Sequence, residues 1–484
     1  MGILRNRLEE YNKSDYCPMH MPGHKRNTQM LGTKLPYNID ITEIDGFDDL
    51  HHPTEIIKDI QERAKKIFGS KESFILVNGS TCGILAGIRS LIKNEDTILV
   101  ARNCHKSVYN AIELNNLKPI YISPNIDEYG IAREINPKDI EEELEKNPEI
   151  KLVVLTSPTY EGIISNLQEI VKIAHNHNVP VLVDEAHGAH IAFMSENEDA
   201  KSQEAIKAGA DIVIQSLHKT LPALTQTAIL HIQGDYVKIE NIKRQLAIFE
   251  TSSPSYILMS SIDECLQILK ENGKNLFEKY QENLKKFYLK SLKLQKIKIF
   301  GNNIKNEIYD YGKIVIITKN TDISGQMLAD ILRKKYKIEI EMASVNYVIA
   351  MTSICDNWNN FERLLNALIE IDSKCNLSKH NLNSGNLENK CNAKINKLDI
   401  SEKDMEICQA INYEKAKMVN YKKSEGAISK EYIWVYPPGV PIITPGEKIN
   451  KKTIKTLEIY SENGIEVRTD SNKFPEIKII KNRN

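Results

Sequence analysis

Short apolar runs alternate with amphipathic stretches over the first half of the chain. Two of the amphipathic stretches, residues 55–68 and 166–177, carry apolar positions at helical spacing. The apolar runs are continuous rather than alternating, which is typical of strands in a sheet covered on both faces. This order of elements predicts an α/β domain with a mainly parallel sheet. The runs that we interpret as its strands are residues 73–77, 97–101, 118–122, 151–156, 180–184 and 210–215.

The second half of the chain has a different pattern. Residues 236–300 are Lys-rich and helical in pattern, and residues 376–400 are rich in Asn, Lys and Ser without clear periodicity. Strand-like runs, as in a smaller α+β domain, lie between them at residues 313–318, 336–341 and 347–351. We expect five parts: an N-terminal leader segment (1–50), a large domain with the helices that follow it (51–300), a small α+β domain (301–375), a linker (376–403) and a C-terminal domain (404–484).

Composition excludes several classes of protein. The 484 residues include 64 Lys and Arg and 65 Asp and Glu, and the formal net charge of -1 argues against a globally basic nucleic-acid binder. No apolar run approaches the roughly 18 residues that span a bilayer, and the polar N-terminus has no signal-peptide core. The 8 cysteines show no CxxC or zinc-finger spacing. We expect a cytoplasmic protein with reduced thiols, no metal site, and neither nucleic acid nor membrane as a partner.

Polar residues that follow the predicted strands are the first candidates for chemistry, because ligands of open α/β sheets bind at the carboxyl ends of the strands. Lys219 follows the sixth run, where a sheltered amine can lose its proton and act as a nucleophile. Asp184 ends the fifth run, and a carboxylate there needs a partner such as a protonated ring nitrogen. His187 comes three residues later. The plain alternatives are a solvated surface lysine and a helix N-cap Asp beside a packing His.

Two further segments carry candidate ligands. Residues 78–83 place Ser80 and Thr81 at the start of a predicted helix, where hydroxyls and backbone N–H groups can hold a phosphate. The segment is neither GxGxxG nor a Walker A loop, and an ordinary Ser/Thr cap explains it equally well. His105 follows the second run and could stack its ring on a cofactor, although a polar loop histidine is the plainer explanation.

Together the strand ends offer a lysine, a carboxylate and an anion cradle, which are the groups that pyridoxal 5′-phosphate (PLP) requires. On these and further motifs the chain resembles the fold-type-I PLP-dependent ornithine/lysine/arginine decarboxylases, in the shorter form that lacks an N-terminal receiver-like domain. The matching motifs, in family order, are residues 21–25, 48–53, 78–81, 104–107, 157–162, 184–188, 216–220, 251–256, 436–441 and 445–447.

The resemblance implies an aspartate-aminotransferase-like large domain with a mainly parallel seven-stranded sheet, a small α+β domain and a C-terminal α+β domain. It implies that Lys219 bonds covalently to PLP, that Asp184 pairs with the pyridine nitrogen, that His105 stacks on the ring and that His187 reaches the phenolic oxygen. The phosphate would be held by Ser80, Thr81, Ser216 and His218. Residues 251–256, with Ser253, would approach the phosphate of a neighbouring subunit, which makes a homodimer or a higher homo-oligomer the expected assembly.

The implied reaction is decarboxylation of a basic L-amino acid to an amine and carbon dioxide. Arginine is the first choice, since short-form relatives often supply polyamine synthesis, followed by lysine or ornithine. Candidate partners for the distal cation of the substrate are Glu43, Asp45 and Glu161, although acidic loops are usually solvated. A PLP-dependent aminotransferase or aldolase is an alternative, but residues 345–356 contain no arginine that could anchor a carboxylate. A PLP-binding regulatory protein is the non-enzymatic alternative.

Overall fold

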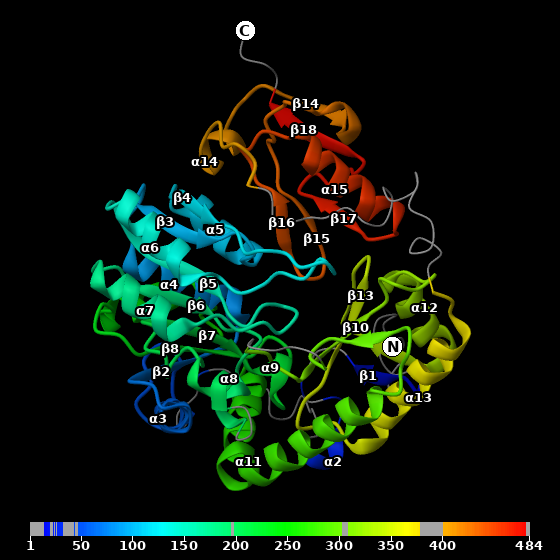
Figure 1. Cartoon of the computed structure of the whole chain (residues 1–484). Coiled ribbons are helices and arrows are strands. Elements are labelled where there is room, and N and C mark those ends of the chain that lie inside the picture. Colours follow the sequence, from blue (N-terminus) through cyan, green and yellow to red (C-terminus); the bar gives the residue numbers. More distant parts are fainter. Residues whose placement is uncertain are drawn as a thin grey trace, which may run out of the picture.

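The computed structural model describes residues 14–19, 23, 25, 27–31, 43, 47–194, 198–302, 308–377 and 400–480. Most of the predicted linker, residues 378–399, lies outside these residues. Figure 1 shows three parts: a large domain around one sheet, a small domain beside it, and a C-terminal domain, in orange and red, next to both. Helix α11 (Tyr256–Ser291) runs along the base of the molecule from the large domain to the small one.

The large domain is built on a seven-stranded sheet with the order β2-β8-β7-β6-β5-β3-β4. Neighbouring strands from β7 to β4 pair in parallel, and β8 is antiparallel to both β7 and β2. The strands are β2 (Glu72–Leu76), β3 (Thr97–Ala101), β4 (Lys118–Ile122), β5 (Ile150–Thr156), β6 (Val181–Asp184), β7 (Ile212–Ser216) and β8 (Ala228–Ile232). The six predicted strands and the mainly parallel sheet are therefore confirmed, whereas β8 was missed.

Helices cover this sheet as the continuous apolar strands require. Helix α4 packs closely because it has glycine where it meets the sheet: a Cβ on Gly83 would lie 2.7 Å from Leu76 Cδ1, and one on Gly87 would lie 2.9 Å from Leu182 Cδ1. The helices of the large domain are α3 (Ile56–Phe68), α4 (Gly79–Leu91), α5 (Lys106–Leu114), α6 (Pro137–Lys146), α7 (Leu167–Asn176), η2 (Ile191–Phe193), α8 (Glu198–Ser202), α9 (Leu217–Thr220) and α10 (Ile239–Phe249).

The small domain contains an antiparallel sheet with the order β12-β13-β10-β9. Its elements are β9 (Lys298–Ile299), β10 (Lys313–Ile317), α12 (Gly325–Tyr336), β11 (Ile338–Ile340), β12 (Met342–Ala343), β13 (Tyr347–Met351) and α13 (Trp358–Lys374). The predicted strand at 336–341 is wrong at its start, because α12 continues to Tyr336 and ends at Lys337, whose φ of 55° is left-handed.

The leader (residues 1–50), for which the sequence pattern predicts no helix or strand, does contain regular structure. It contains α2 (Thr28–Leu31) and β1 (Cys17–Met19), and β1 pairs in parallel with β11 in a separate two-stranded sheet. In Figure 1 β1 accordingly lies beside the small domain, whose residues are far from β1 in the sequence. The leader is thus built into the small domain through main-chain hydrogen bonds.

The C-terminal domain has its own apolar core, which includes Ile433, Ile443, Leu457 and Ile477. Strands β14 and β18 form one antiparallel pair, and β16-β15-β17 form a three-stranded sheet. Its elements are α14 (Ile407–Ile411), β14 (Ala416–Asn420), η4 (Tyr421–Lys423), β15 (Ile433–Val435), β16 (Val440–Ile443), α15 (Lys451–Glu462), β17 (Val467–Thr469) and β18 (Glu476–Ile480).

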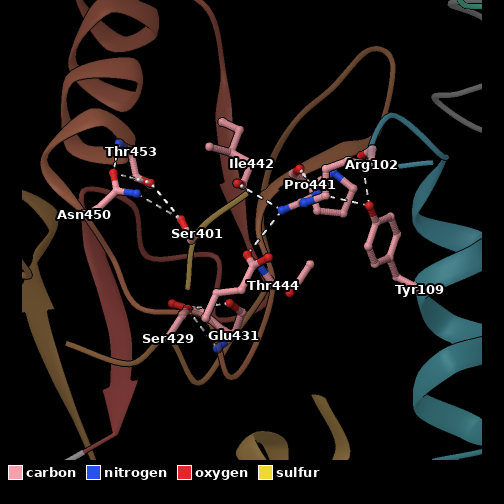
Figure 2. Close-up of polar contacts among 11 residues, drawn as sticks. Arg102, Tyr109, Ser401, Ser429, Glu431, Pro441, Ile442, Thr444, Asn450 and Thr453 are labelled. Atoms are coloured by element: carbon pink, nitrogen blue, oxygen red, sulfur yellow. Dashed lines mark hydrogen bonds and ion pairs between the residues drawn. The ribbon is translucent and has the colours of Figure 1, made fainter. Parts of the chain in front are cut away.

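A buried ionic contact joins the C-terminal domain to the large domain. Arg102, which follows β3, donates to the carbonyls of Pro441 (2.7 Å) and Ile442 (3.2 Å) and pairs with Glu447 at 3.2 Å. The hydroxyl of Tyr109 in α5 lies 3.0 Å from the same guanidinium (Figure 2). We call Arg102, Tyr109, Pro441, Ile442 and Glu447 the anchor cluster. Because the side chains of Arg102 and Glu447 are each 1% exposed, this contact fixes the C-terminal domain against the end of β3.

Candidate active site

The predicted chemical residues meet at one edge of the large sheet. Asp184 is the last residue of β6 and Ser216 is the last residue of β7, the next strand in the sheet. Lys219 follows within α9. Since β6 and β7 are parallel, their carboxyl ends lie side by side, which brings these residues together as the sequence predicted.

Lys219 and Asp184 form the buried ionisable centre of this edge. Asp184 is 3% exposed, and its Oδ1 accepts a hydrogen bond from the Ala186 N–H at 3.1 Å. Burial raises the pKa of the Asp184 carboxyl, against the opposing attraction of Lys219. Burial lowers the pKa of the Lys219 amine, against the attraction of Asp184 and then of Glu341. Both groups are therefore shifted toward their neutral forms, as is common at reactive sites.

The expected phosphate cradle is in part assembled. The hydroxyl of Ser80, in the first turn of α4, lies 2.6 Å from that of Ser216. Gly79 opens the helix with a φ of 75°, a conformation that favours glycine. Thr81 is exposed. His218 Nδ1 lies 3.0 Å from the Thr227 carbonyl, which can only accept, so this nitrogen carries the proton.

His105 lies between the large domain and the C-terminal domain. It caps α5, and its Nδ1 accepts from the Ser107 N–H at 3.2 Å. The Lys106 N–H donates to the Gly439 carbonyl at 3.0 Å, and a Cβ on Gly439 would lie 3.0 Å from His105 Nε2. Burial lowers the pKa of His105 to about 4, and Lys219 and Lys106 add to this effect. The ring is thus neutral, flat and covered by the turn that the 436–441 motif forms.

His187 contacts two lysines, one of which the sequence analysis missed. Its Nε2 lies 2.9 Å from the Nζ of Lys219, and its Nδ1 lies 2.6 Å from the Nζ of Lys313. Lys313 begins β10 in the small domain and is 1% exposed. A lysine at the start of an apolar run normally reaches solvent, so no sequence signal marked it as a site residue.

Gly23 and Lys25 of the 21–25 motif contact helix α9, which carries Lys219, and the small domain. The Gly23 N–H donates to the His218 carbonyl, and a Cβ on Gly23 would lie 2.5 Å from the Leu221 carbonyl oxygen. Ser353 donates to the Gly23 carbonyl at 2.6 Å, and Lys25 donates to the Met351 carbonyl at 3.0 Å. Gly23 therefore lies directly between α9 and the small domain, where a side chain would not fit.

The remaining predicted residues have no described hydrogen bond to Lys219 or Asp184. Glu161 is buried and accepts from the Tyr347 hydroxyl at 2.8 Å, while Glu43 is exposed. Asp45 lies outside the described residues. Ser253 is exposed before α11, and its N–H donates to Thr251 Oγ1 at 3.1 Å. No described hydrogen bond joins Ser253 to the other predicted residues.

A second residue of the small domain, this one acidic, was also missed. Glu341 lies in the turn between β11 and β12 and accepts a hydrogen bond from the Tyr160 hydroxyl. Burial lowers the pKa of both Lys219 and Lys313, and the Glu341 carboxylate opposes this lowering. Glu341 thus faces the lysines from the small domain, where no motif of the sequence analysis pointed.

Two negative findings bear on the class of protein. In the part of the chain that the structure describes, no three His, Cys, Asp or Glu side chains gather in a way that could hold a metal ion. None of the helices in that part combines the length and apolar character needed to cross a bilayer.

Comparison with known proteins assigns the family. The model of the Orn/Lys/Arg decarboxylase major domain matches residues 4–312, and that of the C-terminal domain matches residues 387–467. The chain is 32% identical over 482 residues to an arginine decarboxylase of Halalkalibacterium halodurans, covering 97% of this chain and 95% of the relative. It is 31% identical over 487 residues to an arginine decarboxylase of Bacillus subtilis, covering 98% and 96%.

The solved structures confirm the fold class. The lysine decarboxylase LdcF of Francisella novicida superposes with a TM-score of 0.77 at 22% identity, covering 99% of this chain and 81% of that one. The expected aspartate-aminotransferase-like arrangement, PLP fold type I, is therefore confirmed, together with its two further domains. From these matches and the site residues, we conclude that the chain belongs to the Orn/Lys/Arg decarboxylases, a family of enzymes that decarboxylate basic amino acids.

Proposed function

We propose that the protein is a PLP-dependent decarboxylase of a basic L-amino acid, with arginine as the first choice and lysine or ornithine next. The observation that carries this proposal is the joint placement of Lys219 and Asp184 at the ends of neighbouring parallel strands. The full-length similarity to two arginine decarboxylases supports arginine. The resulting amine would enter polyamine synthesis.

The residues present fit PLP. The paired hydroxyls of Ser80 and Ser216 at the N-terminus of α4 suit a phosphate, which both the helix dipole and the donors favour. The buried carboxylate of Asp184 suits a protonated ring nitrogen, and the amine of Lys219 suits the aldehyde. The flat neutral ring of His105 suits a stacked aromatic ring.

When bound, PLP supplies an electron sink for the pair of electrons that the departing carboxylate leaves behind. Asp184 would hold the proton on the ring nitrogen, because its carboxylate is buried at the strand end, away from water. His105 and the turn at Gly439 keep that side of the site dry. Lys219 Nζ, linked to His187 Nε2, returns a proton to the Cα of the substrate.

The distal cation of the substrate requires an anion on the far side of the site. Glu161 and Glu341 are our candidates. Burial lowers the pKa of Lys313, and both carboxylates lie close enough to oppose this lowering. Tyr347 and Tyr160 hold the two carboxylates by hydrogen bonds, so each is oriented before a substrate arrives. Glu43 is exposed and is therefore the weaker candidate.

A homodimer is the expected active unit. His51 Nε2 lies 2.9 Å from the Thr251 carbonyl, so the 48–53 and 251–256 motifs adjoin each other. Phe47, Ile56 and Ile248 are 44%, 49% and 60% exposed near these motifs, which leaves apolar surface for a second copy. Ser253 of the partner subunit would then approach the phosphate.

Two measurements test this function. Reduction of the PLP-loaded protein with borohydride, followed by peptide mapping, should place the cofactor on Lys219. A panel of arginine, lysine and ornithine should then release carbon dioxide, most rapidly from arginine. Keto acid formation would favour the aminotransferase alternative. PLP binding without release of either product would favour the regulatory alternative.

A further inference from the structure

The buried histidine of the site is held between two amines from different domains. His187 is 6% exposed, and each of its ring nitrogens lies within hydrogen-bond distance of one lysine Nζ, Lys219 on one side and Lys313 on the other. We call these three residues the lysine cluster. The 2.6 Å and 2.9 Å separations mean that both contacts are hydrogen bonds, so each must have one donor and one acceptor.

The number of protons in the lysine cluster is limited by its chemistry. A neutral imidazole has one N–H and one bare nitrogen, whereas an ammonium group can only donate. Two ammonium groups cannot both donate to one neutral ring, because the protonated nitrogen would face one of them. Burial, Lys219 and Lys313 lower the pKa of His187 well below its ordinary value, so the ring is neutral. One of the two lysines must therefore be an uncharged amine.

The surroundings place the cation on Lys313. The carboxyl of Asp310 is the strongest attraction acting on Lys313, and the Tyr160 carbonyl accepts from its Nζ at 3.4 Å. His190 lies 3.0 Å from Asp310, and although burial opposes it, this contact lowers the pKa of Asp310 and keeps it ionised. The partner of Lys219 is Asp184, whose pKa burial raises. Lys313 thus has the firmer counter-charge.

We propose that Lys313 is a positioning residue for Lys219. Its ammonium donates to Nδ1 of His187, so the proton of the ring stays on Nε2, and this N–H donates to the Nζ of Lys219. Lys219 is thereby held as a neutral amine. Its protonation state is set by Lys313, a residue of the small domain.

The chemical consequence rests on the proposed function. The Nζ of neutral Lys219 adds to the aldehyde carbon of PLP, a C=N bond forms, and the carbonyl oxygen leaves as water with the two amine protons. An ammonium group at Lys219 would first have to lose a proton. The other charged or titratable groups that act on the three members of the cluster are His105, Tyr160, Glu161, Asp184, His218, Asp310 and Glu341.

The test follows the proton on Lys219 without using the reaction. PLP-free protein is treated with trace acetic anhydride from pH 6 to 11, and the acetylation of Lys219 is measured by mass spectrometry of its peptide. In Lys313→Met we expect the midpoint of the pH profile of Lys219 acetylation to rise by about one pH unit or more. Labelling at neutral pH should then be about tenfold slower than in wild type. At the alkaline end, where Lys219 is neutral in both proteins, the two rates should be equal. Lys313→Arg, which still only donates, should keep the wild-type profile. Lys334→Met, which removes an exposed lysine paired with Asp330, is the matched control.

Three results would overturn the proposal. An unchanged profile in Lys313→Met means that Lys313 does not set the proton count. If the acetylation rate of Lys219 in Lys313→Met falls by the same factor at every pH, Lys313 has a merely structural role. A shift of full size in a His187→Leu background means that the two lysines interact through space and not through the ring. If Lys313→Met does not fold, nitrogen NMR of ¹⁵N-histidine wild-type protein decides, since the proposal requires the proton on Nε2. Absence of any PLP absorbance in wild-type protein would instead count against the proposed function alone.

Discussion

Arg102 and Lys313 are both 1% exposed, yet the molecule handles the two buried cations in different ways. In the anchor cluster, Arg102 meets two carbonyl oxygens and the Glu447 carboxylate, which are groups that only accept. In the lysine cluster, Lys313 meets an imidazole nitrogen, which accepts or donates according to where its proton lies.

This difference separates a structural charge from a reactive one. A guanidinium stays protonated in proteins, so its environment can be fixed for one charge state. Lysine loses its proton more readily, and burial lowers the pKa of Lys313 to about 8, close to the physiological range. We therefore expect changes in the anchor cluster to alter stability, and changes around the lysine cluster to alter chemistry.

The largest effect should come from Asp184→Ala, which removes the carboxylate that acts on Lys219 of the lysine cluster. Loss of electrostatic stabilisation at a reacting centre lowers turnover by about 10³-fold, and more where the group also holds a proton. Carbon dioxide release should fall by at least that factor, while the circular dichroism spectrum and melting profile stay close to wild type. Turnover near wild type would remove Asp184 from the site.

Glu447→Gln tests the anchor cluster, because it leaves the buried guanidinium of Arg102 without a counter-charge. Breaking such a pair typically destabilises by about 3–5 kcal/mol. Urea unfolding should show this loss, whereas Glu402→Gln, which removes an exposed partner of Lys448, serves as the control with little change. The double variant Arg102→Met/Glu447→Leu should recover most of the stability. A Glu447→Gln protein as stable as the control would show that the anchor cluster does not hold the domains together.

A third prediction concerns His231, a buried titratable group outside both clusters. Its Nδ1 lies 2.8 Å from the Ser73 hydroxyl, and burial alone lowers its pKa to about 3. The unfolded chain therefore binds the proton first as pH falls below 6.5. The free energy of unfolding should decrease from pH 6.5 toward pH 3, with His231 contributing up to about 1.4 kcal/mol per pH unit.

His231→Gln should flatten this dependence, while the same change at the exposed His177 should not. Chemical denaturation at several pH values measures both. An equal slope in wild type and His231→Gln would mean that other groups control the acid sensitivity.

The smallest effect should come from Gly439→Ala, where the anchored domain meets the reactive site. Gly439 has a φ of 85°, and the added Cβ would lie 3.0 Å from His105 Nε2. Gly426 has a similar φ of 75° with nothing within 4 Å of such a Cβ, so Gly426→Ala controls for backbone strain. We expect about threefold to tenfold weaker PLP binding in Gly439→Ala only, or about 1 kcal/mol. Equal binding in both variants would show that the turn does not position His105.

The sequence was sufficient for those parts of the molecule that obey local rules. Continuous apolar runs identified six strands of the large sheet, and the polar residues at their ends include Asp184, Ser216 and Lys219, which do lie together. Strand β8 was missed because His231 interrupts its apolar run, and only a tertiary contact with Ser73 makes this histidine compatible with burial.

The missing half of the site depends on contacts between distant segments. Lys313 and Glu341 come from the small domain, and each is buried or oriented by residues more than 120 positions away, such as His187 and Tyr160. Gly23 was recognised as part of a motif, but its contact with Leu221 cannot be deduced from spacing. Side chains that act across a domain boundary leave no periodic signal in either segment.

The leader limits how far the two domains can separate. Met19 is bonded to Ile340 of the small domain, and the Gly23 N–H is bonded to the backbone at His218, next to Lys219. Four residues of chain reach about 14 Å at full extension. Any wider separation of the two domains must therefore either break the pairing of β1 with β11 or displace the backbone beside Lys219. The position of the Lys219 amine is thus tied to the distance between the domains.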